Sequence, residues 1–406
     1  MAVGYSHLPE MHPVKGIRLG TVSAGIKKSG RRDLVVIEMA EGSHCAGVFT
    51  RNAFCAAPVV VAKEHLNSTS PRYLVINTGN ANAGTGKQGM LDAVKTCESM
   101  AQHTGCSAEQ ILPFSTGVIG MNLPMEKLLS GLPPAMAALS ETGWEDAAFG
   151  IMTTDTVPKG VSEKLQIGNA TVTITGIIKG SGMIHPDMAT MLGFIFTDAK
   201  IEQALLTKCL QQATKITFNR ITVDGDTSTN DAVVLGATNQ LDMPAITSLQ
   251  DEAGKLFQNA VTKVCQQLAQ LVIRDGEGAS KYISIIVNGA GTVNEAEQVG
   301  FTVAHSPLVK TAFFASDANW GRILAAVGRA GLDHLNIDKV SIYLDDTCIV
   351  ENGGRALSYT EEQGQSVMSK PEITVRIELG RGSESATIWT SDLSHDYVKI
   401  NAEYRT

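Results

Sequence analysis

The stretch that decides the fold runs from Lys179 to Leu192 and reads KGSGMIHPDMATML. It joins two apolar segments, TVTITGIIKG at 171–180 and TMLGFIFTDA at 190–199, whose β-branched residues predict two neighbouring strands. The glycines, proline and aspartate between them are typical of a plain connection. However, the connection is long for a hairpin and contains apolar residues, and Thr190 opens the second strand. The sequence is therefore compatible with a functional loop at this position.

Thr190 follows a small residue, Ala189, and this pair has the chemistry of a concealed N-terminus. A threonine hydroxyl is a poor nucleophile until a base takes its proton. If the Ala189–Thr190 bond were cut, Thr190 would carry its own base, because an α-amine titrates near pH 7.7 to 8.0. An ordinary loop between two strands stays open as the competing interpretation on these residues alone.

The bulk composition narrows the class of protein. The chain has 406 residues, a net charge of -8 and 43% hydrophobic residues. An acidic balance disfavours a general nucleic-acid binder, and no apolar run reaches the roughly 18 residues that a membrane helix needs. Seven cysteines without a CxxC pair and nine histidines without an HxH or HExxH pattern predict reduced thiols and no metal site. We expect a soluble, cytoplasmic protein.

Apolar segments of strand length alternate with helical patterns along the whole chain, which predicts an α/β or α+β fold with many short strands. Strands are expected at 33–40, 45–50, 57–63, 73–78, 111–120, 171–180, 190–199, 282–290, 339–350 and 372–379, with a strand, a loop and a further element within 220–238. Helices are expected at 87–105, twice within 125–152, and at 201–216, 244–273 and 307–329.

A change in composition near GEGASK, at 276–281, marks the expected domain boundary. We therefore predict a larger nucleophile-bearing α/β domain over 1–280, a smaller α+β domain over 281–395, and a C-terminal tail over 396–406 that returns to the active site.

Two glycine-rich or acidic segments resemble ligand loops but depart from the known patterns. NTGNANAGTGKQG at 77–89 follows a strand and precedes a helix, yet it has neither GxGxxG nor GxxxxGK[ST]. DGDTSTND at 224–231 lacks the spacing and the final glutamate of a calcium loop. We interpret the first as a tight turn and the second as a polar network.

The full set of motifs resembles the ornithine acetyltransferase family of arginine biosynthesis, and the resemblance extends over nearly the whole chain. It is carried by KGSGMIHPDMATML, STGVIG (115–120), MTTDT (152–156), DGDTSTND, RDGEGASK (274–281) and INAEYRT (400–406).

The resemblance implies a layered α/β sandwich of the N-terminal-nucleophile type. It further implies self-cleavage between Ala189 and Thr190 into an α chain of 1–189 and a β chain of 190–406, which assemble as an α2β2 heterotetramer. The implied reaction moves an acetyl group from N-acetylornithine to glutamate through an acetyl-threonine ester, releasing ornithine and N-acetylglutamate. Whether acetyl-CoA also serves as a donor stays open, and no cofactor is implied.

Site residues follow from the same resemblance. Thr116, through its hydroxyl, and Gly117, through its backbone N–H, would form the oxyanion hole, although STG alone is typical of a polar turn. The positions that match substrate contacts are Thr153, Lys179, Thr190, Glu277, Asn401 and Thr406. A cation such as Lys179 suits the α-carboxylate that both substrates share.

Glu277 suits the ornithine side-chain ammonium, and Asn401 or Thr406 could receive the glutamate side chain. Two other functions stay open: an N-terminal-nucleophile aminopeptidase or amidase that uses water as the acceptor, and a non-catalytic amino-acid-binding protein.

Overall fold

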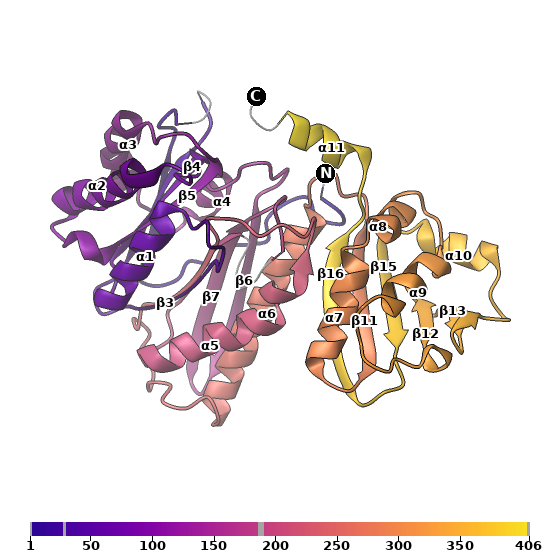
Figure 1. The fold of residues 1–406 in the computed structure, drawn as a ribbon. Helices are drawn as coiled ribbons and strands as arrows, with labels where there is room; N and C mark the ends of the chain where they lie inside the picture. Colours follow the sequence, from indigo (N-terminus) through magenta and orange to yellow (C-terminus); the bar gives the residue numbers. More distant parts are fainter. Residues whose placement is uncertain (1, 27–29, 186–190, 404–406) are drawn as a thin grey trace.

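The computed structural model describes residues 2–26, 30–185 and 191–403 (Figure 1). Two sheets and the helices outside them build the N-terminal part of the molecule. The first sheet has the order β1-β2-β4-β5 and the second the order β3-β10-β8-β7-β6. The first comprises β1 (Ile17–Val22), β2 (Leu34–Met39), β4 (Tyr73–Asn80) and β5 (Ile111–Val118). The second comprises β3 (His44–Phe49), β6 (Lys159–Ile167), β7 (Ala170–Lys179), β8 (Leu192–Thr197) and β10 (Ala232–Ala237).

These two sheets pack face to face. Side chains from one sheet, such as Phe114, meet side chains from the other, such as Phe194, in one buried core. Helices cover the outer faces: α1, α2 and α3 lie on the first sheet, and α5 and α6 lie on the second. The helices are α1 (Ala57–Ser68), α2 (Gly86–Thr104), α3 (Met125–Ala137), α4 (Trp144–Gly150), α5 (Gln203–Ile216) and α6 (Glu252–Arg274). The predicted layered α/β fold is confirmed.

A third sheet, with the order β14-β13-β12-β15-β11-β16-β9, forms the C-terminal part of the molecule with its own hydrophobic core (Figure 1). Its strands are β9 (Ile221–Thr222), β11 (Tyr282–Ala290), β12 (Ser341–Leu344), β13 (Thr347–Glu351), β14 (Gly354–Arg355), β15 (Glu372–Glu378) and β16 (Glu384–Ser391). Its helices are α7 (Val293–Ala304), α8 (Pro307–Phe314), α9 (Trp320–Gly328) and α10 (Glu361–Met368). Short 3-10 turns occur at Ala108–Gln110, Phe218–Arg220 and Ile337–Lys339.

The hairpin predicted around the opening stretch is present. β7 and β8 pair antiparallel, with Lys179 opposite Leu192 and Ile174 opposite Thr197. The predicted stop of the second helix is also confirmed, because Gly105 ends α2 in the left-handed conformation with a φ of 71°.

The strand predicted at 57–63 is wrong, because this segment begins helix α1. Pro58 stands in the first turn, where its missing N–H costs nothing, and Val59 and Val61 are buried in two hydrophobic clusters. Packing therefore overrides the β preference of the three valines.

Three other predicted elements are broken or shorter in the structure. The helix expected at 307–329 is two helices, α8 and α9, separated by Ser316 at a φ of 54°. The strand expected at 339–350 is a hairpin that turns at Asp345, with a φ of 49°. The helix expected from 244 begins only after Asp251, whose side chain accepts a hydrogen bond from the backbone N–H of Gly254.

The last helix, α11 (His395–Ala402), leaves the third sheet and lies against loops of the N-terminal half (Figure 1). Ser394 caps it and donates a hydrogen bond to the Gly278 carbonyl over 2.7 Å. None of its own residues is fully buried, but Tyr397 packs against the hydrophobic core beneath it.

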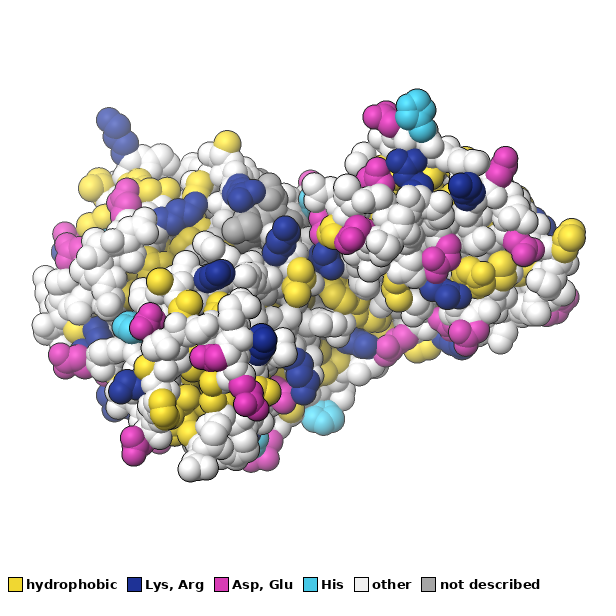
Figure 2. All heavy atoms as spheres, turned by 90° about the horizontal axis from the view of Figure 1, so that it is seen from below, with side chains coloured by type: hydrophobic (Ala, Val, Ile, Leu, Met, Phe, Trp, Pro, Cys, Tyr) yellow, Lys and Arg dark blue, Asp and Glu magenta, His cyan; other side chains and the backbone are white. Residues whose placement is uncertain are grey.

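The surface carries charges of both signs. Figure 2 shows Lys and Arg side chains gathered near the middle of one face, with acidic side chains more frequent toward its ends. Within the described residues, no helix is long and apolar enough to cross a membrane.

Candidate functional site

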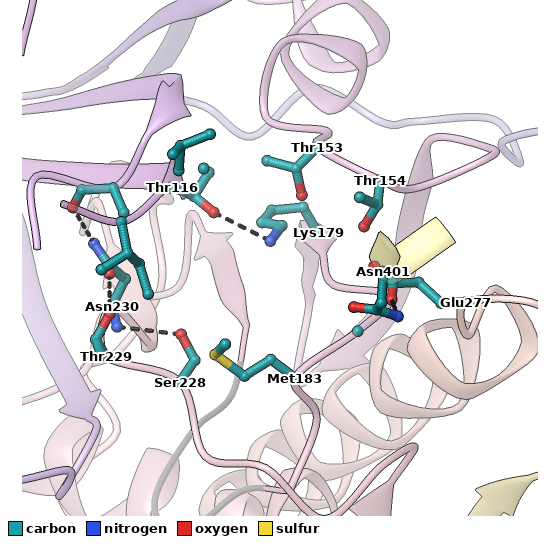
Figure 3. A pocket seen from close by; sticks show the side chains of 15 residues that line it. Thr116, Thr153, Thr154, Lys179, Met183, Ser228, Thr229, Asn230, Glu277 and Asn401 are labelled. Atoms are coloured by element: carbon teal, nitrogen blue, oxygen red, sulfur yellow. Dashed lines mark hydrogen bonds between the residues drawn. The ribbon is translucent and has the colours of Figure 1, made fainter. Parts of the chain in front are cut away.

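One pocket collects the described residues that the sequence singled out. Strand ends from both packed sheets, the loops after α4 and α6, and helix α11 all contribute to a cavity of about 280 Å³ (Figure 3). Its lining includes six predicted site residues: Thr116, Gly117, Thr153, Lys179, Glu277 and Asn401. Ala189, Thr190 and Thr406 lie outside the described residues. The fold thus brings together positions that are far apart in the sequence.

Thr116 and Gly117 stand at the end of β5, where the pairing with β4 becomes irregular at Gly79 and Asn80. Gly117 has a φ of 138°, and a Cβ atom there would overlap the carbonyl carbon of Gly79. Only glycine fits this position without moving the backbone. The Thr116 hydroxyl accepts a hydrogen bond from the Lys179 ammonium over 3.2 Å, so the two sheets meet directly at the pocket.

Asn230 fixes the same strand end from the other side. Its side-chain amide donates to the Ala81 carbonyl over 2.6 Å and to the Ser115 carbonyl over 2.9 Å. The side-chain oxygen Oδ1 of Asn230 accepts from the Thr229 hydroxyl over 2.6 Å. Because Ser115 precedes Thr116, this amide holds the backbone on which the candidate oxyanion residues stand.

The segment NTGNANAGTGKQG is held by further asparagines. Asn80 accepts from the Asn82 backbone N–H over 2.7 Å, and Asn82 donates to the Gly89 carbonyl over 2.9 Å. Both side chains are therefore engaged with the segment's own backbone, which agrees with its interpretation as a tight turn.

A buried ion cluster lies behind the charged side of the pocket. The Lys159 ammonium is fully buried and contacts one carboxylate oxygen of Asp155, at 2.6 Å, and one of Asp275. Burial alone would raise the pKa of Asp155, but the charges of Lys159 and Lys179 hold it well below its ordinary value. Burial would likewise lower the pKa of Lys159, and the two aspartates raise it instead. Asp155 and Lys159 are therefore both charged near neutral pH.

This cluster positions two segments at the pocket, the loop 152–156 and the end of β7. Asp155 accepts from the backbone N–H groups of Thr153 and Gly180, each over 2.8 Å. Asp275 accepts from the backbone N–H and the hydroxyl of Thr156. The buried charges thus hold the backbone of both segments in one arrangement.

Ser181 connects this cluster to Glu277. The Ser181 hydroxyl donates to the Asp275 carbonyl over 2.5 Å, and the Ser181 carbonyl accepts from the backbone N–H of Glu277 over 2.8 Å. The backbone of Glu277 is therefore fixed beside the cluster.

Glu277 and Asn401 close the far end of the pocket. The Asn401 amide donates to Oε2 of Glu277 over 2.8 Å, and both side chains lie on the same side of the cavity as Thr153 and Thr154 (Figure 3). A Cβ atom on Gly182 would overlap the carboxylate of Glu277, so this position of the carboxylate needs a glycine beside it.

The acidic loop DGDTSTND forms the polar network that its sequence suggested. Asp224 accepts from the backbone N–H groups of Met183 and Ile184, over 2.7 and 2.9 Å, and from the Tyr397 hydroxyl over 3.1 Å. One carboxylate thus joins the β7–β8 connection to helix α11.

Asp231, the last acid of that loop, is buried, and its Oδ2 atom has no hydrogen-bond partner among the residues that the structure describes. Burial raises the pKa of Asp231 well above its ordinary value, although a hydrogen bond from Ser228 and the charge of Lys179 oppose the shift. Asp231 therefore adds less negative charge near Lys179 than its sequence suggests.

Sequence reasoning missed several residues of the site. Thr154, Met183 and the segment 228–230 line the pocket, and Asp155 and Lys159 support it from behind. The motifs MTTDT and DGDTSTND contain most of these positions, so a signal was present as clusters of small polar residues. Lys159 gave no signal, because an isolated lysine is usually exposed.

Comparisons with known proteins agree with the resemblance. The ArgJ family model matches residues 18–406. The arginine biosynthesis bifunctional protein ArgJ of Pseudomonas syringae pv. tomato is 57% identical over 406 residues, which cover 100% of both chains. The protein of the same name from Methylococcus capsulatus is 58% identical over 97% of this chain and 96% of its own.

A solved structure of ornithine acetyltransferase from Mycobacterium tuberculosis, complexed with ornithine, is 35% identical. The match covers 44% of this chain and 94% of that one, with a TM-score of 0.38. The family model and the full-length identities to both bacterial relatives together show that this chain belongs to the ArgJ family.

Proposed function

We propose that this protein transfers the acetyl group of N-acetylornithine to glutamate in arginine biosynthesis, through an ester on Thr190. The observation that carries the proposal is the full-length identity to proteins named for arginine biosynthesis, 57% over 406 residues. The pocket supports it, because a cation, a carboxylate and a glycine-bearing strand end line one small cavity.

The nucleophile is made by self-cleavage. The Thr190 hydroxyl attacks the Ala189 carbonyl carbon, the peptide C–N bond breaks to leave an ester, and water hydrolyses that ester. The α chain then ends in the Ala189 carboxylate, and the β chain begins with the free α-amine of Thr190. This amine serves as the base for the later steps.

In the first half-reaction, the Thr190 hydroxyl attacks the acetyl carbonyl carbon of N-acetylornithine and gives its proton to the α-amine. The amide C–N bond then breaks, and the departing nitrogen of ornithine receives that proton from the α-amine. In the second half-reaction, the uncharged amine of glutamate attacks the ester carbonyl carbon and gives a proton to the Thr190 α-amine. The ester C–O bond then breaks, the Thr190 oxygen takes that proton, and N-acetylglutamate leaves. The kinetics are therefore ping-pong.

Each step passes through an oxyanion, for which we assign the Thr116 hydroxyl and the Gly117 N–H as donors. Removing one such donor costs about 3 kcal/mol of transition-state stabilisation in other acyl-transfer enzymes. The Lys179 ammonium donates to the Thr116 hydroxyl oxygen over 3.2 Å, which leaves the hydroxyl proton free to turn toward the oxyanion.

Recognition of both amino acids uses the charged side of the pocket. Lys179 binds the α-carboxylate that ornithine and glutamate share, with Thr153 beside it. Glu277 binds the side-chain ammonium of ornithine, and Asn401 or Thr406 binds the side-chain carboxylate of glutamate. The Glu277–Asn401 contact supports this division. The Asn401 amide, which donates to the Glu277 carboxylate here, can donate instead to the side-chain carboxylate of a bound glutamate.

Two further properties belong to the proposal. The α and β chains assemble as α2β2, and acetyl-CoA serves as a second acetyl donor, as the word "bifunctional" in the relatives' names suggests. The direct test of donor use supplies acetyl-CoA and glutamate without N-acetylornithine. Formation of N-acetylglutamate in this assay supports acetyl-CoA as a second donor. If no N-acetylglutamate forms, acetyl-CoA is not a donor.

The test of transfer itself measures product in the presence and absence of glutamate. N-acetylornithine with glutamate is expected to yield ornithine and N-acetylglutamate in equal amounts. Steady release of acetate that glutamate does not change would instead indicate an amidase.

A further inference from the structure

Met183 stands out on the pocket wall as an apolar side chain in an unusual conformation. Its φ is 56°, which is uncommon for any residue with a Cβ atom, and the residue is 41% exposed. The next residue, Ile184, is fully buried in the core. A non-glycine residue held in this region of φ and ψ often marks a functional site.

Asp224 holds Met183 in that conformation. Its two carboxylate oxygens accept the successive N–H groups of Met183 and Ile184, over 2.7 and 2.9 Å. The Ile184 carbonyl accepts in turn from the Val223 N–H over 2.8 Å and from the Thr222 hydroxyl over 3.0 Å. The backbone around Met183 is therefore fixed, which sets the direction in which its Cα–Cβ bond leaves the wall.

That direction is into the pocket. Figure 3 shows the Met183 side chain reaching toward Ser228, across the cavity from Thr116 and Lys179. The other apolar side chains of this lining belong to the loop after β4 and to the β5 end that carries Gly117; they are Ala81, Val118 and Ile119. Met183 thus supplies the apolar wall on the side opposite the candidate oxyanion donors.

An acyl group held by those donors has its carbonyl oxygen at Thr116 and Gly117, and its alkyl part must lie in the remaining space. The charged side of the cavity, with Glu277 and Asn401, suits the amino acid and not a methyl group. An alkyl group gains most where it leaves water against apolar atoms. Met183 is an apolar side chain in a position to limit its length.

We propose that Met183, positioned by Asp224, determines acyl-chain specificity by closing the space beyond the acetyl methyl group. This assignment rests on the proposed acetyl transfer. A shorter side chain opens room for a longer acyl group, whereas an apolar side chain of similar volume keeps the limit.

The experiment compares kcat/KM for transfer to glutamate from N-acetylornithine and from N-propionylornithine. The variants are Met183→Ala, Met183→Leu as the volume-matched control, and Asp224→Asn. One methylene in an apolar pocket changes selectivity by roughly tenfold or more, so Met183→Ala is expected to raise the propionyl-to-acetyl ratio by about tenfold. Met183→Leu is expected to keep the ratio within about twofold of the wild type.

Asp224→Asn tests the positioning role. The substitution does not alter the Met183 side chain itself. It removes the negative charge that binds the N–H groups of Met183 and Ile184, so Met183 is held less firmly and the propionyl-to-acetyl ratio is expected to rise. A merely structural role for Asp224 would lower both rates equally and leave the ratio as it was. If Met183→Ala is not recovered as folded protein, the propionyl-to-acetyl ratio of Asp224→Asn is compared with that of the wild type instead.

An unchanged ratio in both Met183→Ala and Asp224→Asn, with acetyl transfer still measurable, would overturn the inference and leave the proposed function intact. Absence of acetyl transfer by the wild-type chain would overturn the proposed function, and the inference with it.

Discussion

The side-chain amide of Asn401 lies 2.8 Å from Oε2 of Glu277, which joins the last helix of the chain to the segment that follows α6. The carboxylate is thereby held between this amide and Gly182, where a larger residue would overlap it. Because Glu277 is buried at the end of the pocket opposite Thr116, a positively charged group that enters the cavity meets it there.

Replacing Glu277 with glutamine should therefore weaken the use of N-acetylornithine. The substitution keeps the size of the side chain and removes its charge, so we expect KM for N-acetylornithine to rise by about tenfold or more, as for a lost charged hydrogen bond. Discharge of the acetyl-enzyme by glutamate should change less, because its side chain gains nothing from that charge. Initial-rate measurements with each substrate varied in turn check this.

The matched control is Glu145→Gln on the exposed surface of α4, which should leave both KM values unchanged. An unaltered KM for N-acetylornithine in Glu277→Gln would show that the ammonium is bound elsewhere.

Gly117→Ala should nearly abolish transfer. The added Cβ atom would overlap the Gly79 carbonyl carbon, so the strand end that carries Thr116 must move. Loss of one oxyanion donor lowers kcat by roughly 10²- to 10³-fold in other acyl-transfer enzymes. The rate of the first turnover measures this directly.

Gly120→Ala is the control for this substitution. Gly120 also has a positive φ, of 85°, but a Cβ atom there meets no atom of the described residues within 4 Å. It should cost some stability and leave most of the activity. Equal losses in the two variants would argue that backbone strain, and not the donor position, explains the effect.

Lys159→Met should destabilise the protein strongly. The substitution leaves Asp155 and Asp275 buried without their cation, and breaking a buried ion pair in this way costs about 3 to 5 kcal/mol. Lys263→Met, which removes a surface contact with Glu163, should cost less than about 1 kcal/mol. Thermal unfolding of both variants beside the wild type separates these cases, and similar melting temperatures would contradict the role of the cluster.

Stability should fall between pH 6.5 and pH 4 through His305. Burial lowers the pKa of His305 to about 4, with further contributions from the charges of His185, Lys310 and Arg329. The unfolded chain, with a histidine pKa near 6.5, binds the proton first as the pH falls, so the folded state loses stability across this window. After allowance for partial exposure, the loss is on the order of 2 kcal/mol.

His305→Gln removes this titration, so its melting temperature should fall less between about pH 7 and pH 4.5 than that of the wild type. A wild-type melting temperature that falls no further than that of the variant would contradict the assignment.

Some parts of the fold could be predicted from local sequence because they depend on local chemistry. The β7–β8 hairpin follows from β-branched residues on both sides of a glycine-containing connection, and the end of α2 follows from Gly105. Helix α1 could not be predicted in this way, because its three valines favour a strand until the packing against β5 is known.

The site was predictable to the extent that its chemistry lies in continuous motifs. Thr116, Lys179 and Glu277 stand within such motifs, and the structure places them in one pocket. Asp224 lies in the motif DGDTSTND, but its partners stand 40 positions away, so the motif predicts a polar network and not the residues that it binds. Lys159 contacts a residue 116 positions away, and no local pattern marks it. The conformation of Met183 likewise depends on a carboxylate from another segment.

The central claim is that Thr190 carries the acetyl group between the two substrates. The most direct measurement mixes the protein with N-acetylornithine in the absence of glutamate, quenches it rapidly, and determines the mass of the β chain and the position of any adduct. We predict a single acetyl group on Thr190 that disappears on addition of glutamate as N-acetylglutamate forms. An unmodified β chain, or an acetyl group lost at the same rate with and without glutamate, would contradict the account.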